Sequence, residues 1–151
     1  GPGVATDDAL HDLPLGKGVI RRKGKGVSLL AFGSMLSPAL AAAEELDATV
    51  ANMRFVKPID RELIVELARE HSLLVSIEEN AVIGGAGSEV ARVLEEIEHS
   101  AQFIRMGLPD RFIDHGDQSL LLSEIGLDKE GIIRTVRTHL NTAAPTTHQE
   151  Q

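Results

Sequence analysis

A glycine-rich segment preceded by two carboxylates is the part of the sequence best suited to chemistry. Glu78 and Glu79 are followed, after a short interval, by Gly84-Gly85-Ala86-Gly87-Ser88. A glycine-rich turn that begins a helix presents free N–H groups, and such groups can bind phosphate or another anion. The same glycines could serve only to permit a tight turn between a strand and a helix. The sequence leaves both interpretations open.

The spacing of these glycines agrees only in part with a dinucleotide-binding fingerprint. Gly85 and Gly87 match the first two glycines of G-x-G-x-x-G, but Val90 stands at the third position. That position must be small so that the helix can lie close to the strand. No Gly-Lys-Ser/Thr follows the loop, which excludes a Walker A phosphate loop. A free-standing nucleotide-binding or small-molecule-binding module is therefore an alternative rather than the leading hypothesis.

The two glutamates are not expected to act together. They are adjacent at the end of an expected strand, so their side chains point to opposite faces and should not share a proton or a metal ion. One could pair locally while the other faces a partner, or both could simply be solvated at the strand end. The six histidines show no H-x-x-x-H or H-E-x-x-H spacing and the chain has no cysteine, so no metal site is predicted. His115 is the remaining candidate, because it lies in an expected loop.

Strands and helices alternate along the chain that positions these residues. Strands at 18–23 and 27–32, joined by Gly24-Lys25-Gly26, are expected to form an antiparallel hairpin. The next helix is expected at 38–46, with Ser37 as its N-cap and Pro38 at its first position. The remaining predicted strands are 49–54, 73–77 and 102–106. Four more helices are predicted: one is capped by Asp60, one begins after Gly87, and two span 119–124 and 128–140.

This alternation predicts an α/β fold with three layers, α/β/α. The sheet should have about five strands, mostly parallel, with one antiparallel edge strand. The composition fits one domain with a core, since 42% of the 151 residues are hydrophobic and 25% are charged. Residues 1–13 are expected to be a linker that begins with a protease scar, Gly1-Pro2-Gly3. Residues 14–140 form the domain, and residues 141–151 form a disordered tail.

Charge and composition also restrict the partners. A net charge of -8 repels nucleic acid and anionic membranes. No apolar run approaches the roughly 20 residues that a membrane span needs. Aromatic residues make up only 3% of the chain, which leaves few side chains for stacking against bases or sugars. The absence of cysteine fits the cytoplasm.

Several segments together resemble the C-terminal domain of the transketolase family. The resemblance covers residues 14–140 and is carried by Pro14-Leu15-Gly16-Lys17-Gly18, Leu30-Ala31-Phe32-Gly33-Ser34, Asn52 to Asp60, Ile77-Glu78-Glu79-Asn80, Gly84 to Ser88, Gly107 to Gly116 and Gly126-Leu127-Asp128. The glutamate and glycine segment is shared widely across such domains. The segments M-R-F-V-K-P-I-D and G-L-P-D-R-F-I are similar to those of one branch, whose members make 1-deoxyxylulose 5-phosphate.

The resemblance implies a parent enzyme that condenses pyruvate with glyceraldehyde 3-phosphate and releases CO2. Such enzymes use thiamine diphosphate and Mg²⁺, and their product feeds isoprenoid and thiamine biosynthesis. The family's diphosphate motif begins Gly-Asp-Gly within another domain, and this chain contains no such sequence. We therefore expect no catalytic, cofactor-binding or metal-binding residue in this chain, and no activity from the chain alone.

The leading hypothesis is a structural and assembly domain of such an enzyme. Its expected partners are the remaining domains of the parent enzyme and the other subunit of a homodimer. The expected contact surface comprises Glu78, Glu79, Asn80, Gly84, Gly85, Gly87, Ser88 and His115. Two alternatives are the equivalent domain of a transketolase or of a 2-oxo-acid dehydrogenase β-subunit, and an acidic interaction domain without a ligand.

Overall fold

The structure is a computed structural model that describes residues 14–81, 85–108 and 126–143. Its elements in chain order are β1 (Val19–Arg22), β2 (Val27–Ala31), η1 (Gly33–Met35), α2 (Leu36–Leu46), β3 (Thr49–Asn52), α3 (Arg61–Glu70), β4 (Leu73–Ala81), α4 (Ala86–Glu95), β5 (Gln102–Leu108) and α6 (Lys129–Ala143). None of the helices in this described part has the length and apolar character needed to cross a membrane.

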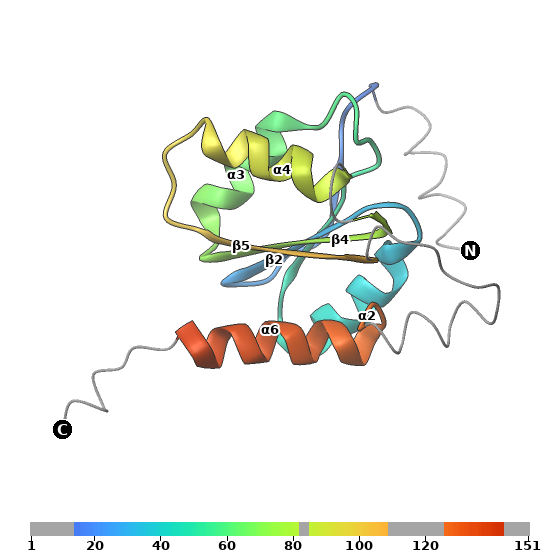
Figure 1. Cartoon of the computed structure of the whole chain (residues 1–151), viewed down its shortest axis with the longest axis vertical. Helices are drawn as coiled ribbons and strands as arrows, with labels where there is room; N and C mark the ends of the chain where they lie inside the picture. The colour runs from blue at the N-terminus through green and yellow to red at the C-terminus, as the bar shows by residue number, and fades with distance from the viewer. Residues whose placement is uncertain (1–13, 82–84, 109–125, 144–151) are drawn as a thin grey trace.

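One five-stranded sheet lies between two layers of helices, which confirms the predicted fold class (Figure 1). The strand order is β1-β3-β2-β4-β5, and only β1 runs antiparallel to its neighbour. Helices α2 and α6 cover one face, and α3 and α4 cover the other. The connections from β2 to β3 and from β3 to β4 run in opposite directions across opposite faces, as right-handed crossovers require.

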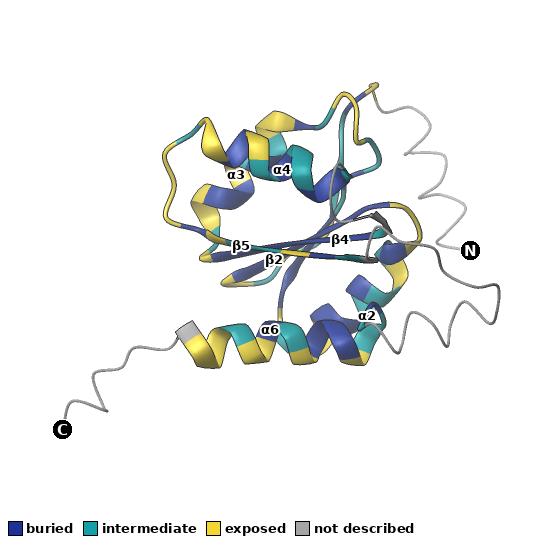
Figure 2. Ribbon diagram, viewed as in Figure 1, coloured by how far each residue is buried: buried dark blue, intermediate teal, exposed yellow. Residues whose placement is uncertain are grey.

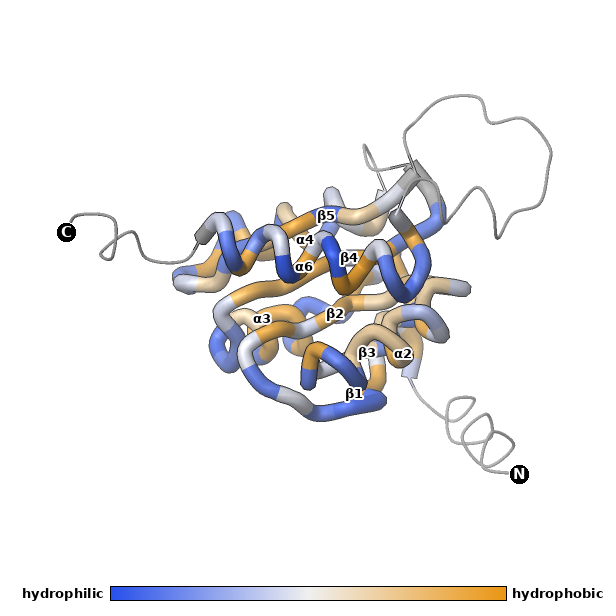
Figure 3. The backbone as a smooth tube through the Cα atoms, turned by 90° about the horizontal axis from the view of Figure 1, so that it is seen from below, coloured by the Kyte–Doolittle hydropathy of each residue, from blue (hydrophilic) through white to orange (hydrophobic). Residues whose placement is uncertain are grey.

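The core is split by the sheet into two apolar clusters, one under each helical layer. Every residue of β2 is buried, as predicted for a central strand covered on both faces. Leu29 packs under α2 and α6, whereas Leu30 packs under α3 and α4. Figure 2 shows the helices with their buried sides toward the sheet, and Figure 3 shows hydrophobic residues along β2 and β4.

The predicted hairpin between the first two strands is wrong. β1 pairs with β3, and β3 lies between β1 and β2. The reason is that β2 has no free edge, since β3 and β4 pair with it in parallel on its two sides. The segment Gly24-Lys25-Gly26, which resembles a hairpin turn in the sequence, therefore passes over the beginning of β3 and connects two strands that are not neighbours. At this crossing a Cβ on Gly24 would collide with the carbonyl oxygen of Asp47, which explains the glycine there.

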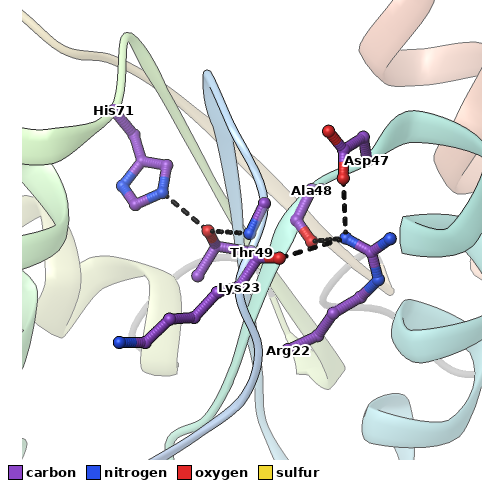
Figure 4. Close-up of polar contacts among 7 residues, drawn as sticks. Arg22, Lys23, Asp47, Ala48, Thr49 and His71 are labelled. Carbon is purple, nitrogen blue, oxygen red and sulfur yellow. Dashed lines mark hydrogen bonds and ion pairs between the residues drawn. The ribbon is translucent and has the colours of Figure 1, made fainter.

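Hydrogen bonds hold this crossing against the start of β3 (Figure 4). The Gly24 N–H donates to Thr49 Oγ1 at 2.9 Å, and Arg22 Nη1 donates to the carbonyl oxygen of Ala48 at 2.9 Å. His71 joins the same network, because its Nε2 lies 2.8 Å from Thr49 Oγ1. Its Nδ1 lies 2.9 Å from the carbonyl oxygen of Leu67 and must donate to it, so in the neutral ring Thr49 donates to Nε2.

Two of the three predicted N-caps are confirmed, and the third is wrong. Asp60 Oδ1 accepts the Leu63 N–H at 3.1 Å and caps α3, and Asp128 Oδ1 accepts the Gly131 N–H at 2.8 Å at the start of α6. Ser37 does not cap α2. The turn η1 leads directly into that helix, which begins at Leu36 without a side-chain cap.

Some predicted boundaries also differ from the observed ones. β4 continues through Glu78-Glu79-Asn80 to Ala81, whereas the prediction ended the strand before Glu78. Helix α6 extends to Ala143, three residues beyond the predicted end at Leu140. The helix predicted at 119–124 lies outside the described residues.

Candidate functional site

The carboxyl ends of β2 and β4 meet where ligands usually bind in an open α/β sheet. The chain leaves β2 toward one face of the sheet and leaves β4 toward the other, so the two strands define a switch point in the topology. The pairing extends one residue beyond β2, because the Phe32 N–H donates to the Ile77 carbonyl oxygen at 3.0 Å. The glutamates and the glycine-rich loop of the predicted site lie directly after this point.

Glu78 occupies the start of helix α4. Its side chain is only 3% exposed. Oε1 accepts the Ala86 N–H at 2.9 Å, and Oε2 accepts the Gly87 N–H at 2.6 Å. A carboxylate is favoured at a helix N-terminus, where it satisfies N–H groups that have no partner within the helix and meets the positive end of the helix dipole. The prediction that one of the two glutamates pairs locally is thus confirmed.

This arrangement argues against a free anion site on the N–H groups of Ala86 to Glu89, at the described start of α4. The N–H groups of Ala86 and Gly87 are already bonded to Glu78, and the next two, from Ser88 and Glu89, donate to the Gly85 carbonyl oxygen. A phosphate would have to displace a buried carboxylate of the same sign. The geometry therefore favours the interpretation of these glycines as turn residues.

Gly87 brings the first turn of α4 close to the sheet. A Cβ at this position would lie 3.0 Å from Ser76 Oγ on β4 and 3.1 Å from Arg105 Nε on β5. The Ser76 hydroxyl is buried and has no hydrogen-bond partner among the described residues. Arg105 donates to Ser88 Oγ, so that β5 is also joined to the helix. The glycine allows a helix–sheet contact that a larger residue would push apart.

The other predicted site residues are only partly placed. Glu79 and Asn80 lie in β4, Gly85 is the N-cap residue of α4, and Ser88 lies in the first turn of that helix. Glu79 and Ser88 are half-buried, whereas Glu78 and Gly87 are buried. Glu78 and Gly87 are therefore not available as parts of an exposed contact surface. Gly84 and His115 lie outside the described residues.

Sequence reasoning missed a second cluster, at the end of β3. Arg54 has a φ of +63°, and the Phe55 N–H donates to the Met53 carbonyl oxygen at 2.6 Å across it. These features describe a γ-turn in its rare, strained form. The Arg54 guanidinium lies 4.8 Å from the centre of the Phe55 ring and donates from Nη1 to the Lys17 carbonyl oxygen at 3.1 Å. An arginine among apolar residues gave no sequence signal for a positive φ.

Asp60 completes this cluster, because each of its two carboxylate oxygens accepts a different backbone N–H. While Oδ1 caps α3, Oδ2 accepts the Gly18 N–H at 2.8 Å, so one buried carboxylate joins the segment before β1 to the start of the helix. The N-cap role was evident from the sequence. The bond to Gly18 joins residues that are 42 positions apart and could not be read from local spacing.

The described residues do not fit thiamine diphosphate and its magnesium ion. Magnesium needs convergent oxygen ligands, and no group of three or more potential ligand side chains occurs within 14–81, 85–108 and 126–143. The N–H groups best placed for a diphosphate are bonded to Glu78.

Comparison with known families identifies the domain to which these residues belong. The family model described as "Transketolase, C-terminal domain" matches residues 16–132. The chain belongs to the transketolase C-terminal domain family. The match includes β1 through the start of α6, and therefore the whole sheet.

Several curated relatives of this family member carry the same protein name. Proteins named 1-deoxy-D-xylulose-5-phosphate synthase from Dechloromonas aromatica and Aromatoleum aromaticum are 65% and 62% identical to it. The matches cover 93% and 91% of the chain, but only 23% and 22% of the relatives. The chain thus spans less than a quarter of the length of these relatives.

A solved structure supports the fold of the family member independently. It is described as a split gene transketolase, an inactive beta4 tetramer, and it superposes with a TM-score of 0.76 at 38% sequence identity. The similarity covers 85% of this chain and 43% of the other.

Proposed function

We propose that this chain is the C-terminal structural and assembly domain of a 1-deoxy-D-xylulose-5-phosphate synthase. The identity of 65% over 141 residues to a protein of that name is the observation that carries the proposal. The parent enzyme would condense pyruvate and glyceraldehyde 3-phosphate with thiamine diphosphate and Mg²⁺ held by its other domains. The homodimer and the cytoplasmic location expected from the sequence belong to the same proposal.

Within this proposal, the end of β4 and the start of α4 contribute to a contact surface, and Glu78 joins these two elements. The carboxylate fixes the start of α4, and the half-buried Glu79 and Ser88 then form part of this contact surface. The expected contacts of Asn80, Gly84 and His115 remain part of the proposal. A transketolase or a 2-oxo-acid dehydrogenase β-subunit is less well supported, because the transketolase structure is only 38% identical.

The test compares three proteins in an assay of 1-deoxyxylulose 5-phosphate formation. The full-length enzyme should be active, this chain alone should be inactive, and an enzyme that lacks the domain should lose activity together with its dimer in sedimentation. Activity of this chain alone would contradict the proposal. Micromolar binding of thiamine diphosphate to the chain in calorimetry would also contradict it.

A further inference from the structure

Two of the three exposed large hydrophobic side chains in the described part of the chain belong to two segments that lie against each other. Leu15 is 73% exposed and Val56 is 36% exposed. They come from separate segments that meet, because a Cβ on Gly16 would lie 2.8 Å from Cγ of the exposed Pro58. We call Leu15, Val56 and Pro58 the Leu15 patch. Single exposed apolar residues are ordinary, whereas a group formed by two segments can mark an interaction site.

Specific bonds hold both segments of the Leu15 patch in place. Arg54 donates to the Lys17 carbonyl oxygen at 3.1 Å, and Gly18 donates to Asp60 at 2.8 Å. Lys17 Nζ also lies 3.4 Å from a carboxylate oxygen of Glu62. The strained backbone of Arg54 precedes the 56–58 loop directly. The exposure of Leu15 and Val56 is therefore a property of a fixed surface, and local strain of this kind is characteristic of functional sites.

A groove of about 410 Å³ continues from the patch along α4. Its apolar walls include Val56, Pro58, Ile59 and Val93. Two ion pairs lie on its rim, because Arg61 contacts Glu96 at 2.5 Å and Arg92 contacts Glu89 at 2.9 Å, and the exposed Lys57 also lines the groove.

The hydrogen bond to Glu89 raises the pKa of Arg92. A charged ligand would have to compete with these ion pairs. Apolar side chains would not, so the groove suits a polypeptide surface.

The position of the patch identifies the occupant. Residues 14–18 lie at the start of the region that matches the C-terminal domain family, and more than three quarters of the length of the compared relatives lies outside the match. A covalently joined neighbour has a high effective concentration, so a modest apolar contact is enough to dock it. Resting on the proposed function, we propose that the Leu15 patch and its groove dock the domain that precedes this one in the full-length enzyme.

Thiol labelling can test this docking, because the chain contains no cysteine of its own. Leu15→Cys and Val56→Cys are made in this chain and in full-length enzyme whose accessible native cysteines are replaced by serine. Leu140→Cys is the matched control, since it is 42% exposed and lies on α6, which packs on the opposite face of the sheet from α3 and α4. Urea unfolding and circular dichroism confirm that each variant is folded.

We expect labelling at Leu15 and Val56 to slow by about tenfold or more in the full-length enzyme, while labelling at Leu140 changes by less than about twofold. Equal rates at Leu15 and Val56 in both proteins would overturn the proposal. Slow labelling at Leu15 and Val56 in this chain alone would also overturn the proposal. If that labelling rate fell with rising protein concentration, the patch would be covered by self-association instead. A similar slowing at Leu140 would likewise overturn the proposal, because the protection would not be specific.

The activity assay separates this inference from the proposed function. Protection at Leu15 and Val56 in a full-length protein that makes no 1-deoxyxylulose 5-phosphate would leave the docking intact and refute the activity. Full activity with rapid labelling at both positions would refute the docking and leave the activity intact.

Discussion

Replacing Glu78 by glutamine is the most direct perturbation of the α4 start. The variant keeps the size of the side chain, and its amide oxygen can still accept one of the two N–H groups at 2.6–2.9 Å. The amide nitrogen then faces the second N–H, so one buried donor loses its acceptor. The lost charge-assisted bond is worth about 1.5–3 kcal/mol, and the lost charge at the helix start about 0.3–1 kcal/mol.

A neutral side chain is less costly to bury, which offsets part of this loss. We therefore expect Glu78→Gln to lower the free energy of unfolding by about 2 kcal/mol. With a urea dependence of about 2 kcal/mol per molar, the midpoint of unfolding should fall by about 1 M while the slope stays unchanged. Amide hydrogen exchange of Ala86 and Gly87 should accelerate in the same variant, because their N–H groups lose the carboxylate.

Glu95→Gln is the matched control for this experiment. Glu95 is exposed at the other end of α4, where removal of a negative charge is neutral or slightly favourable. The reasoning is refuted if the two variants unfold at the same urea concentration. It is also refuted if Glu78→Gln lowers stability but leaves exchange at Ala86 and Gly87 unchanged.

Three further substitutions test neighbouring features by urea unfolding. Ser76→Ala should raise stability by about 1 kcal/mol, because it removes a buried hydroxyl without a described partner; a loss of stability would contradict this. Asp60→Ala should lower the free energy of unfolding by about 3 kcal/mol, and Asp60→Ser by about half as much, since serine can cap α3 but cannot also reach Gly18. Equal losses in the two variants would argue that Asp60 does not hold both N–H groups. Arg54→Gly should be more stable than Arg54→Ala by about 1 kcal/mol, reversing the usual order, because only glycine adopts a positive φ without steric cost; the usual order would refute the strain.

The layered fold was predictable because each element carries its own local pattern. The apolar run at 27–32 specified a central strand, and Asp60 and Asp128 marked helix starts through side-chain caps. The pairing of β1 was not predictable in this way. Gly24 and its neighbours fit a hairpin turn as well as a crossing, and only the competition of β3 and β4 for both edges of β2 decides between them.

The sequence predicted where the candidate site lies in the fold, at the end of a strand and the start of a helix, but not the bonds made there. Glu78 and the glycines mark the carboxyl end of a parallel strand, which is where a site is expected. Whether the N–H groups of α4 are free depends on the reach of one carboxylate across an interval of eight residues. Similarly, the bond from Asp60 to Gly18 depends on how β1 and α3 pack. Side-chain bonds between distant elements follow from the tertiary structure, and propensity patterns do not encode them.

The chemistry of the glycine-rich loop follows from a competition between two anions. An incoming phosphate would bring negative charge to N–H groups whose partner is already a buried carboxylate. To bind, it would have to expel Glu78 into solvent or face its repulsion at close range, where the low dielectric strengthens it. The intramolecular carboxylate loses no translational freedom when it binds, so it prevails over a free anion of similar intrinsic affinity. The fold alone therefore does not imply a ligand at this helix start, because the side chain at position 78 decides whether the Ala86 and Gly87 N–H groups are free.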